Sequence, residues 1–187
     1  MKKLYYYLIG ILLLILAFIF DNQILIFFTS IRLEFLNKIA IFINNIEGYM
    51  LFIFFLVILL LAKQKNKILP LLLAFLLYFT LTTLIKNIVL RPRPFTKFEF
   101  PQLVNNVNMN KSFPSGHATA VSSIIPFLNF NRTIKYIWVF ITVIVVLSRV
   151  YLGVHYLSDV IAGALLGYLI GDFSIYLVKK YKKRKFD

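Results

Sequence analysis

Ionisable side chains border the later apolar stretches of this 187-residue chain. Seven of them fall at the expected outer ends of those stretches: Lys86, Arg91, Arg93, His117, Arg149, His155 and Asp159. Charged groups are costly beside hydrocarbon, so their concentration at one level predicts a shared polar site. Most of the seven are Lys or Arg, and a cluster of fixed cations is typical of a site for phosphate or another oxyanion.

The spacing of His155 and Asp159 indicates an activated imidazole. Residues four apart share one face of a helix. A carboxylate in that position can hold one imidazole nitrogen as N–H and leave the other as a free lone pair, as a nucleophile or base requires. A helix-stabilising pair at a membrane surface is the alternative. Arg149, beside Ser148, favours the catalytic interpretation because it brings a further anion ligand.

The string Pro114-Ser115-Gly116-His117 predicts an anion site at the start of a helix. Ser115 is a suitable N-cap, and Gly116 lets a ligand approach backbone N–H groups that have no partner within the helix. The same string also forms ordinary turns, and a lone histidine there is more often a capping residue. This string therefore does not identify a catalytic site by itself.

Taken together, three segments resemble the signature of the type 2 phosphatidic acid phosphatase superfamily, which includes lipid phosphate phosphatases, bacterial acid phosphatases and vanadium haloperoxidases. K-x6-R-P runs over 86–94, P-S-G-H over 114–117 and S-R-x5-H-x3-D over 148–159. Arg93 stands at the family's spacing from Lys86, so Arg91 is a neighbour without a defined role and we expect it to matter much less. Leu157 stands where many bacterial relatives have proline.

The resemblance implies a mechanism and a division of roles. His155 attacks phosphorus to form a phosphohistidine, Asp159 orients it, and His117 protonates the leaving oxygen. The residues expected to bind the phosphate are Lys86, Arg93, Ser115, Gly116 and Arg149. Water then hydrolyses the intermediate, and neither a metal nor a cofactor is expected.

The elements that carry these residues are expected to be membrane helices. The chain is 60% hydrophobic with a mean hydropathy of +0.84, too apolar for one water-soluble domain. Six apolar stretches approach the roughly 17 to 25 residues that cross a bilayer. They cover about 4–20, 46–62, 69–85, 116–130, 134–148 and 157–178. We therefore predict an all-α integral membrane protein with six transmembrane helices, forming a single domain over 1–187 with a catalytic core at about 85–171.

The segment between the first two stretches, 21–45, has apolar residues every three or four positions, from Phe28 to Phe42. This spacing predicts an amphipathic helix along the outer interface, with Glu34 and Lys38 placed for an ion pair. An irregular loop is the alternative, because Leu33 and Ile41 would fall on the polar face.

Basic residues indicate the orientation. Six crossings place both termini on one side, and thirteen of the 21 Lys and Arg residues fall there. The positive-inside rule makes that side cytoplasmic and places the site on the extracytoplasmic face of the cell membrane. The basic C-terminal tail is then an orientation signal that could also touch anionic lipid, and neither nucleic acid nor an obligatory protein partner is expected.

A membrane lipid phosphate or diphosphate is the expected substrate. An isoprenoid diphosphate such as undecaprenyl diphosphate is favoured, because the site faces outward and the chain is little more than the catalytic core. Phosphatidylglycerophosphate, phosphatidic acid, lipid A and transfer of phosphate to another lipid remain open. Haloperoxidase activity agrees less well with a membrane location. A scaffold or transporter would not need a nucleophile, an orienting acid and a proton donor.

Overall fold

The computed structural model describes residues 2–46, 48–105 and 107–186, and within these ranges the chain is helical with no strand. The α-helices are α1 (Lys2–Ser30), α2 (Glu34–Asn44), α3 (Gly48–Leu61), α4 (Ile68–Val89), α5 (Gly116–Ser123), α6 (Arg132–Tyr151) and α7 (Leu157–Phe186). Three short 3-10 helices join them: η1 (Lys65–Lys67), η2 (Pro94–Thr96) and η3 (Ile125–Leu128).

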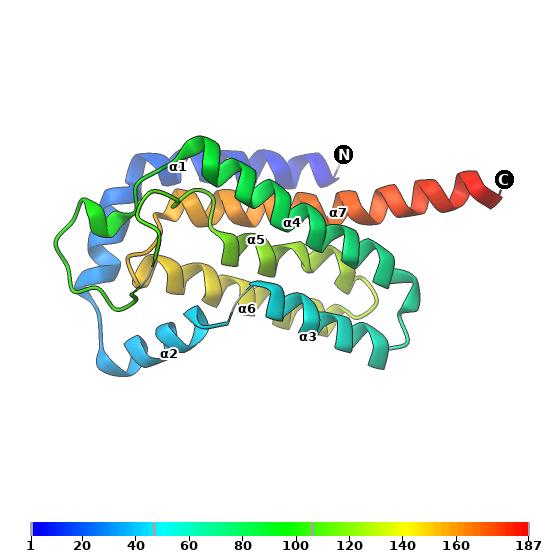
Figure 1. Cartoon of the computed structure of the whole chain (residues 1–187), viewed down its shortest axis with the longest axis horizontal. Coiled ribbons are helices and arrows are strands. Elements are labelled where there is room, and N and C mark those ends of the chain that lie inside the picture. The colour runs from blue at the N-terminus through cyan, green and yellow to red at the C-terminus, as the bar shows by residue number, and fades with distance from the viewer. Residues whose placement is uncertain (1, 47, 106, 187) are drawn as a thin grey trace.

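The helices form a bundle whose two ends differ. Both chain termini lie at one end, together with the connections from α3 to α4 and from η3 to α6 (Figure 1). The long segment between α4 and α5 and the connection from α6 to α7 lie at the other end (Figure 1). All three signature segments therefore meet at the end of the bundle opposite the termini.

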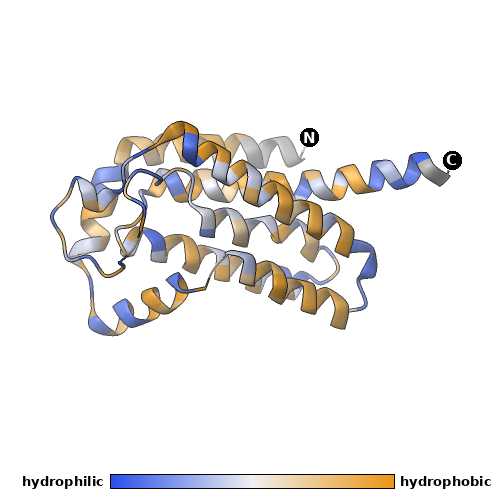
Figure 2. Cartoon of the chain, in the orientation of Figure 1, coloured by the Kyte–Doolittle hydropathy of each residue, from blue (hydrophilic) through white to orange (hydrophobic). Residues whose placement is uncertain are grey.

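Four helical segments of the described chain are long and apolar enough to cross a membrane: 8–30, 65–96, 132–151 and 157–184. The pair α2 and α3 counts as a fifth if taken together, and the segment Gly116–Leu128 is apolar but shorter. Two of the six predicted stretches, 46–62 and 116–130, are thus present as helices below the length of a full span. Helices α1, α3 and α4 are strongly apolar (Figure 2), and many of their large apolar side chains are exposed, as a surface facing hydrocarbon requires.

The first helix differs from the prediction. It continues past Phe20 to Ser30, so Asp21 lies inside α1 instead of beginning the segment 21–45 that was predicted as a separate amphipathic helix. Asp21 is buried and ion-paired with Arg91, with Oδ2 2.8 Å from Nη2, so its charge does not end the helix. The separate helix α2 then begins at Glu34, which pairs with Lys38 at 2.8 Å.

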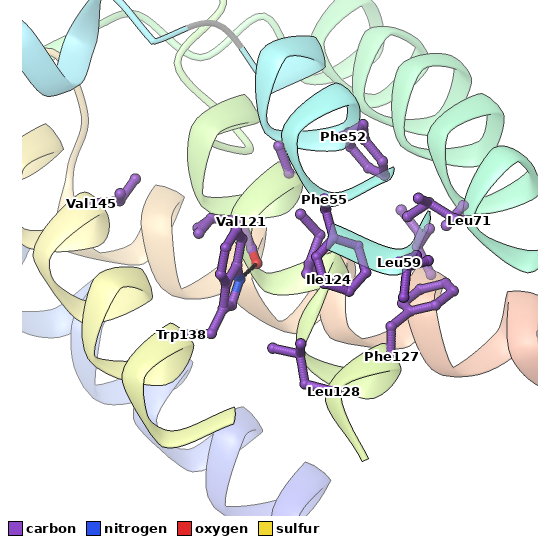
Figure 3. Close-up of a cluster of buried hydrophobic side chains, with 13 residues drawn as sticks. Phe52, Phe55, Leu59, Leu71, Val121, Ile124, Phe127, Leu128, Trp138 and Val145 are labelled. Atoms are coloured by element: carbon purple, nitrogen blue, oxygen red, sulfur yellow. Dashed lines mark hydrogen bonds between the residues drawn. The ribbon is translucent and has the colours of Figure 1, made fainter. Parts of the chain in front are cut away.

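The core of the bundle surrounds the short helix α5. Residues 118–123 are all buried, and they pack among α3, α4, α6 and α7. Phe55 and Phe127 meet edge to face, and Trp138 donates from Nε1 to the carbonyl of Val121 at 2.9 Å (Figure 3). This hydrogen bond satisfies the buried indole and fixes α6 against α5.

Three glycines bring α5 and α7 into close contact. Gly163, Gly167 and Gly171 recur every four residues along one face of α7. A Cβ at these positions would lie 2.6, 2.1 and 2.1 Å from the carbonyl oxygens of residues 115, 119 and 123. Glycine spacing of this kind lets two helix backbones pack closely in a membrane. The beginnings of α5 and α7, which carry two of the three signature segments, are thereby held side by side.

Candidate active site

A cavity of about 380 Å³ opens where the three signature segments meet. Six of the eight predicted site residues line it: Lys86, Arg93, Gly116, His117, Arg149 and His155. Asp159 lies behind His155, and Ser115 lies behind Gly116, both fully buried. None of the described residues that line the cavity is Asp or Glu, so its wall is strongly positive.

The neighbours of His155 define its tautomer. Arg93 Nη1 lies 3.1 Å from Nε2, and an arginine can only donate, so Nε2 is an unprotonated acceptor. The proton of a neutral ring is then on Nδ1, which lies 3.5 Å from Asp159 Oδ2. The carboxylate faces one ring nitrogen, as the spacing of four residues predicted, but His155 lies two residues before α7 and not on a face of that helix.

The surroundings of His155 also determine its charge. Burial lowers the pKa of His155 well below its ordinary value, and the nearby positive charges of Arg93, Lys86 and Arg149 lower it further. The imidazole is therefore neutral at neutral pH, as a nucleophile must be.

Asp159 is held rigidly at the start of α7. Its Oδ2 accepts the backbone N–H of Tyr156 at 2.9 Å, as in a capping box, and also accepts from the hydroxyl of Ser112. Its backbone carbonyl accepts the N–H of Ser115 at 3.0 Å, which ties the start of α5 to the start of α7.

Backbone carbonyls and one side-chain amide orient the three cations of the cavity. Arg93 donates to the carbonyls of Asn108 and Val154, both at 2.7 Å. Lys86 Nζ donates to the carbonyl of Lys111 at 2.8 Å, and Arg149 Nη1 donates to Asn44 Oδ1 at 2.7 Å. Neutral acceptors fix these groups in place without cancelling their charge, so the positive charge remains directed at the cavity.

The start of α5 differs from the prediction in one respect. Ser115 occupies the N-cap position, but its hydroxyl makes no capping hydrogen bond and has no hydrogen-bond partner among the described residues. Gly116 agrees better with its predicted role. A Cβ there would find its nearest atom 3.8 Å away, so a side chain would project toward the cavity and cover the backbone.

His117 stands between two environments. Its Nε2 lies 3.1 Å from the carbonyl of Asn44, which can only accept, so this nitrogen carries a proton. The residue also borders an apolar groove of about 220 Å³. The other groove residues come from the α2–α3 region and from α6: Ile43, Ile46, Leu51, Ile141, Ile144 and Val145. The polar cavity and the apolar groove therefore meet at His117.

A sequence model of the PAP2 superfamily matches residues 67–183, which include all three signature segments. This chain belongs to the PAP2 superfamily. It is a multi-pass membrane protein and a phosphatase of the hydrolase class, as its PAP2 relatives are.

Several PAP2 relatives match most of the chain. An undecaprenyl-diphosphatase of Sulfolobus acidocaldarius is 30% identical, and the match covers 94% of this chain and 92% of the relative. The crystal structure of Aquifex aeolicus LpxE has a TM-score of 0.72 at 27% identity, covering 83% of this chain and 94% of that one. A phosphatidylglycerolphosphate phosphatase from Bacillus subtilis has a TM-score of 0.64 at 28% identity, covering 98% and 96%.

Sequence reasoning missed the residues behind this PAP2 site. Arg91 pairs with Asp159 through Nη1 and Oδ1 at 2.5 Å, and its other nitrogen pairs with Asp21. Ser112 lies outside the three signature segments and was not predicted as a site residue, although its hydroxyl donates to Asp159. The tandem Arg91-Pro92-Arg93-Pro94 drew attention to Arg91 but did not reveal its partners, since one of them comes from α1, 70 residues away.

Proposed function

We propose that this chain removes a terminal phosphate from a membrane lipid by way of a phosphohistidine at His155. The observation that carries the proposal is the position of His155. Its unprotonated Nε2 lies in a cavity with three cations, and Asp159 faces the other ring nitrogen. His155 Nε2 attacks the terminal phosphorus, and the bond from that phosphorus to the oxygen of the leaving group breaks. The leaving group is the lipid monophosphate for a diphosphate substrate and the lipid alcohol for a monophosphate. His117, whose protonation the negative phosphate favours, transfers a proton to the leaving oxygen.

The second step regenerates the protein. Water attacks the phosphohistidine, His117 accepts a proton from that water, and the phosphorus–nitrogen bond breaks to leave His155 neutral and phosphate free. Lys86, Arg93 and Arg149 stabilise the equatorial oxygens in both steps, with help from Ser115 and the Gly116 N–H. Each proton transfer uses a side chain of the protein, so the reaction needs no divalent ion.

The apolar groove supports a lipid leaving group. The leaving oxygen must lie near His117, and the groove extends from that residue along α6. A hydrocarbon tail lying there would stay out of water while its phosphate occupied the polar cavity. An isoprenoid diphosphate is favoured as substrate because the Sulfolobus relative, matched along nearly its whole length, is named for that activity.

The proposed setting is a single domain with six crossings, in which α5 and η3 form a short crossing inside the bundle. The termini are cytoplasmic and the cavity opens to the extracytoplasmic face. Helix α2 lies along the outer interface, which agrees with the exposure of Phe35 and Phe42 at 71% and 69% on its surface.

The test is phosphate release by the purified protein from a panel of undecaprenyl diphosphate, phosphatidylglycerophosphate, phosphatidic acid and lipid A. We expect kcat/KM to be highest for undecaprenyl diphosphate, no turnover by His155→Ala, and an unchanged rate in EDTA. A folded His155→Ala protein with wild-type turnover would exclude the proposed nucleophile. A preference for another lipid would correct the substrate and leave the chemistry standing. Radiolabel on an acceptor lipid, and not in free phosphate, would indicate a phosphotransferase.

A further inference from the structure

Arg91 lies directly behind the proposed catalytic pair and joins two buried carboxylates. One nitrogen of its guanidinium contacts Asp159 at 2.5 Å and Ser158 Oγ at 2.7 Å, and the other contacts Asp21 at 2.8 Å. The side chains of Asp159 and Asp21 are 0% and 6% exposed. The Arg91 side chain is itself 21% exposed, and an arginine shared between two buried carboxylates is strongly held and costly to disturb.

Aromatic rings and the backbone fix the position of Arg91. Its guanidinium carbon lies 4.3 Å from the ring centre of Tyr156 and 5.3 Å from that of Phe18. Leu90, just before it, has φ +46°, a left-handed conformation that a leucine rarely adopts. A strained residue persists where the surrounding structure determines the conformation, and here it directs the chain from the end of α4 to Arg91.

Asp21 contacts the beginning of α7 as well as Arg91. Its Oδ1 accepts the N–H of Ser158 at 2.8 Å, and its Oδ2 accepts the hydroxyl of Ser158. The N–H groups of a first helical turn have no partner within their own helix, so Asp21 acts as a capping residue supplied by another helix. Phe18 and Asp21, three residues apart on α1, therefore hold Arg91 and the first turn of α7 together.

From this geometry we propose that Asp21 and Arg91 are positioning residues, which hold Asp159 against His155 and set the negative charge that Asp159 presents. The inference rests on the proposed function, because it takes His155 as the nucleophile. Arg91 alone would neutralise Asp159. Asp21 shares the positive charge of Arg91, so the three groups keep one net negative charge to stabilise the positive charge that develops on His155. Arg91 is then much more important for catalysis than its place beside the signature suggested. Asp21 lies outside the region that the family model matches.

Charge arithmetic makes the proposal testable. The three groups Asp21, Arg91 and Asp159 carry a net charge of −1. Asp21→Asn brings this to zero, Arg91→Gln brings it to −2, and the double variant restores −1. Phosphate release from farnesyl diphosphate in detergent is measured for the full chain, the three variants and His155→Ala. Asp172→Asn is the matched control, because Asp172, like Asp21, is an aspartate within a long apolar helix, but it lies in α7 and borders a different cavity.

We expect Asp21→Asn to lower kcat by about tenfold or more, as loss of an outer-shell partner typically does. KM should change by less than about threefold, since the phosphate-binding cations are untouched. The double variant should have a higher kcat than Arg91→Gln alone, because it restores the net charge. Asp172→Asn should keep the wild-type rate. If a neutral variant does not fold, Asp21→Glu and Arg91→Lys replace the pair, and each should lower kcat because it breaks the bridging geometry.

The acid limb of the pH profile of kcat/KM shows whether Asp21→Asn acts by removing a charge near His155 or by loosening the helix. Several titratable or charged groups face His155 and are the same in every variant: Lys86, Arg93, His117, Arg149 and Asp159. Removing the negative charge of Asp21 disfavours protonated His155, so its pKa falls and the acid limb moves to lower pH. A helix that merely loosened would admit water and raise the pKa of His155 toward its ordinary value, which would move the limb to higher pH.

Three results would overturn the proposal, provided that His155→Ala is inactive. The first is a kcat for Asp21→Asn or Asp21→Glu within about twofold of wild type, and the second is a double variant whose loss of kcat is the product of the two single losses. The third is an acid limb that moves to higher pH. Turnover by His155→Ala would instead contradict the proposed function itself.

Discussion

Around His155, the side chains divide into cations that line the cavity and groups that support the ring from behind. Arg93 and Arg149 belong to the first set, since both border the cavity and are held there by neutral acceptors. Negative charge moves onto the phosphoryl oxygens in the transition state, so these cations stabilise the transition state more than the bound substrate.

Arg93→Ala and Arg149→Ala should therefore act mainly on turnover. We expect kcat to fall by about 100- to 1,000-fold for each, the range found when one group that stabilises transition-state charge is removed. Steady-state kinetics with farnesyl diphosphate measures it. Arg132→Ala, an exposed arginine at the opposite end of α6, is the control and should keep the wild-type kcat. A loss confined to KM would show that the two arginines only bind the ground state.

The site could be predicted from sequence as far as its residues lie in short, regularly spaced strings. The four-residue spacing of His155 and Asp159 predicted that the carboxylate faces one ring nitrogen, but not which one, and not that His155 precedes the helix that carries Asp159. The support behind Asp159 could not be predicted in this way. Asp21 is an isolated acid in an apolar helix, and only the packing of α1 against α7 brings it to Arg91.

At the scale of elements, one helix too short to cross a membrane depends on its neighbours for its position. Helix α5 has only eight residues and is buried, and it is positioned by the glycine face of α7. The three glycines could have been found in the sequence by their spacing of four, but their partner helix could not. The lengths of α4 and α6 followed closely from their apolar stretches, whereas α1 exceeded its stretch because a buried ion pair carried it past Asp21.

Gly167→Ala tests the contact between α5 and α7. The new Cβ would lie 2.1 Å from the carbonyl oxygen of Thr119, a backbone atom that cannot move without shifting α5. We expect a loss of about 1 to 3 kcal/mol in the free energy of unfolding, typical of overpacking. Thermal unfolding in detergent measures it as a lower Tm. Gly10→Ala is the control: its Cβ would lie 2.3 Å from the end of the Leu165 side chain, which can rotate away. An equal Tm for both variants would show that the helix contact is not close in solution.

Ile144→Trp tests the apolar groove beside His117. The larger side chain should fill part of the groove and exclude a long tail. We expect kcat/KM for farnesyl diphosphate to fall by about tenfold, the loss expected when contacts of one or two methylenes are excluded. The value for isopentenyl diphosphate, whose tail is much shorter, should stay near wild type. Ile137→Trp, an exposed position on the same helix outside the groove, should change neither substrate. Equal losses for both chain lengths would place the tail elsewhere.

For the whole molecule, the distribution of basic residues agrees with the arrangement of the chain ends. The basic connection between α3 and α4, the connection before α6 and the basic end of α7 lie at the end of the bundle that carries the termini (Figures 1 and 2). The cavity lies at the opposite end. In the proposed orientation, a lipid of the outer leaflet reaches this cavity while its tail remains in hydrocarbon.

Single cysteines test that orientation in a chain that has none. A cysteine at Asn105, an exposed residue beside the cavity, should react with a membrane-impermeant thiol reagent in intact cells. One at Asn66, within η1, should react only after permeabilisation. Labelling is read by mass shift on a gel. The reverse pattern would place the cavity on the cytoplasmic side and would remove the topological reason for preferring a carrier-lipid diphosphate.

The covalent intermediate on His155 is the central chemical claim, and trapping it is the most direct measurement. Protein is mixed with farnesyl diphosphate labelled in its terminal phosphate, quenched within milliseconds in alkaline detergent, and digested for mass spectrometry. We expect labelled phosphate on the peptide that contains His155, and none in His155→Ala. Label on a different residue, or rapid release of phosphate with no labelled protein at any time, would contradict nucleophilic attack by His155.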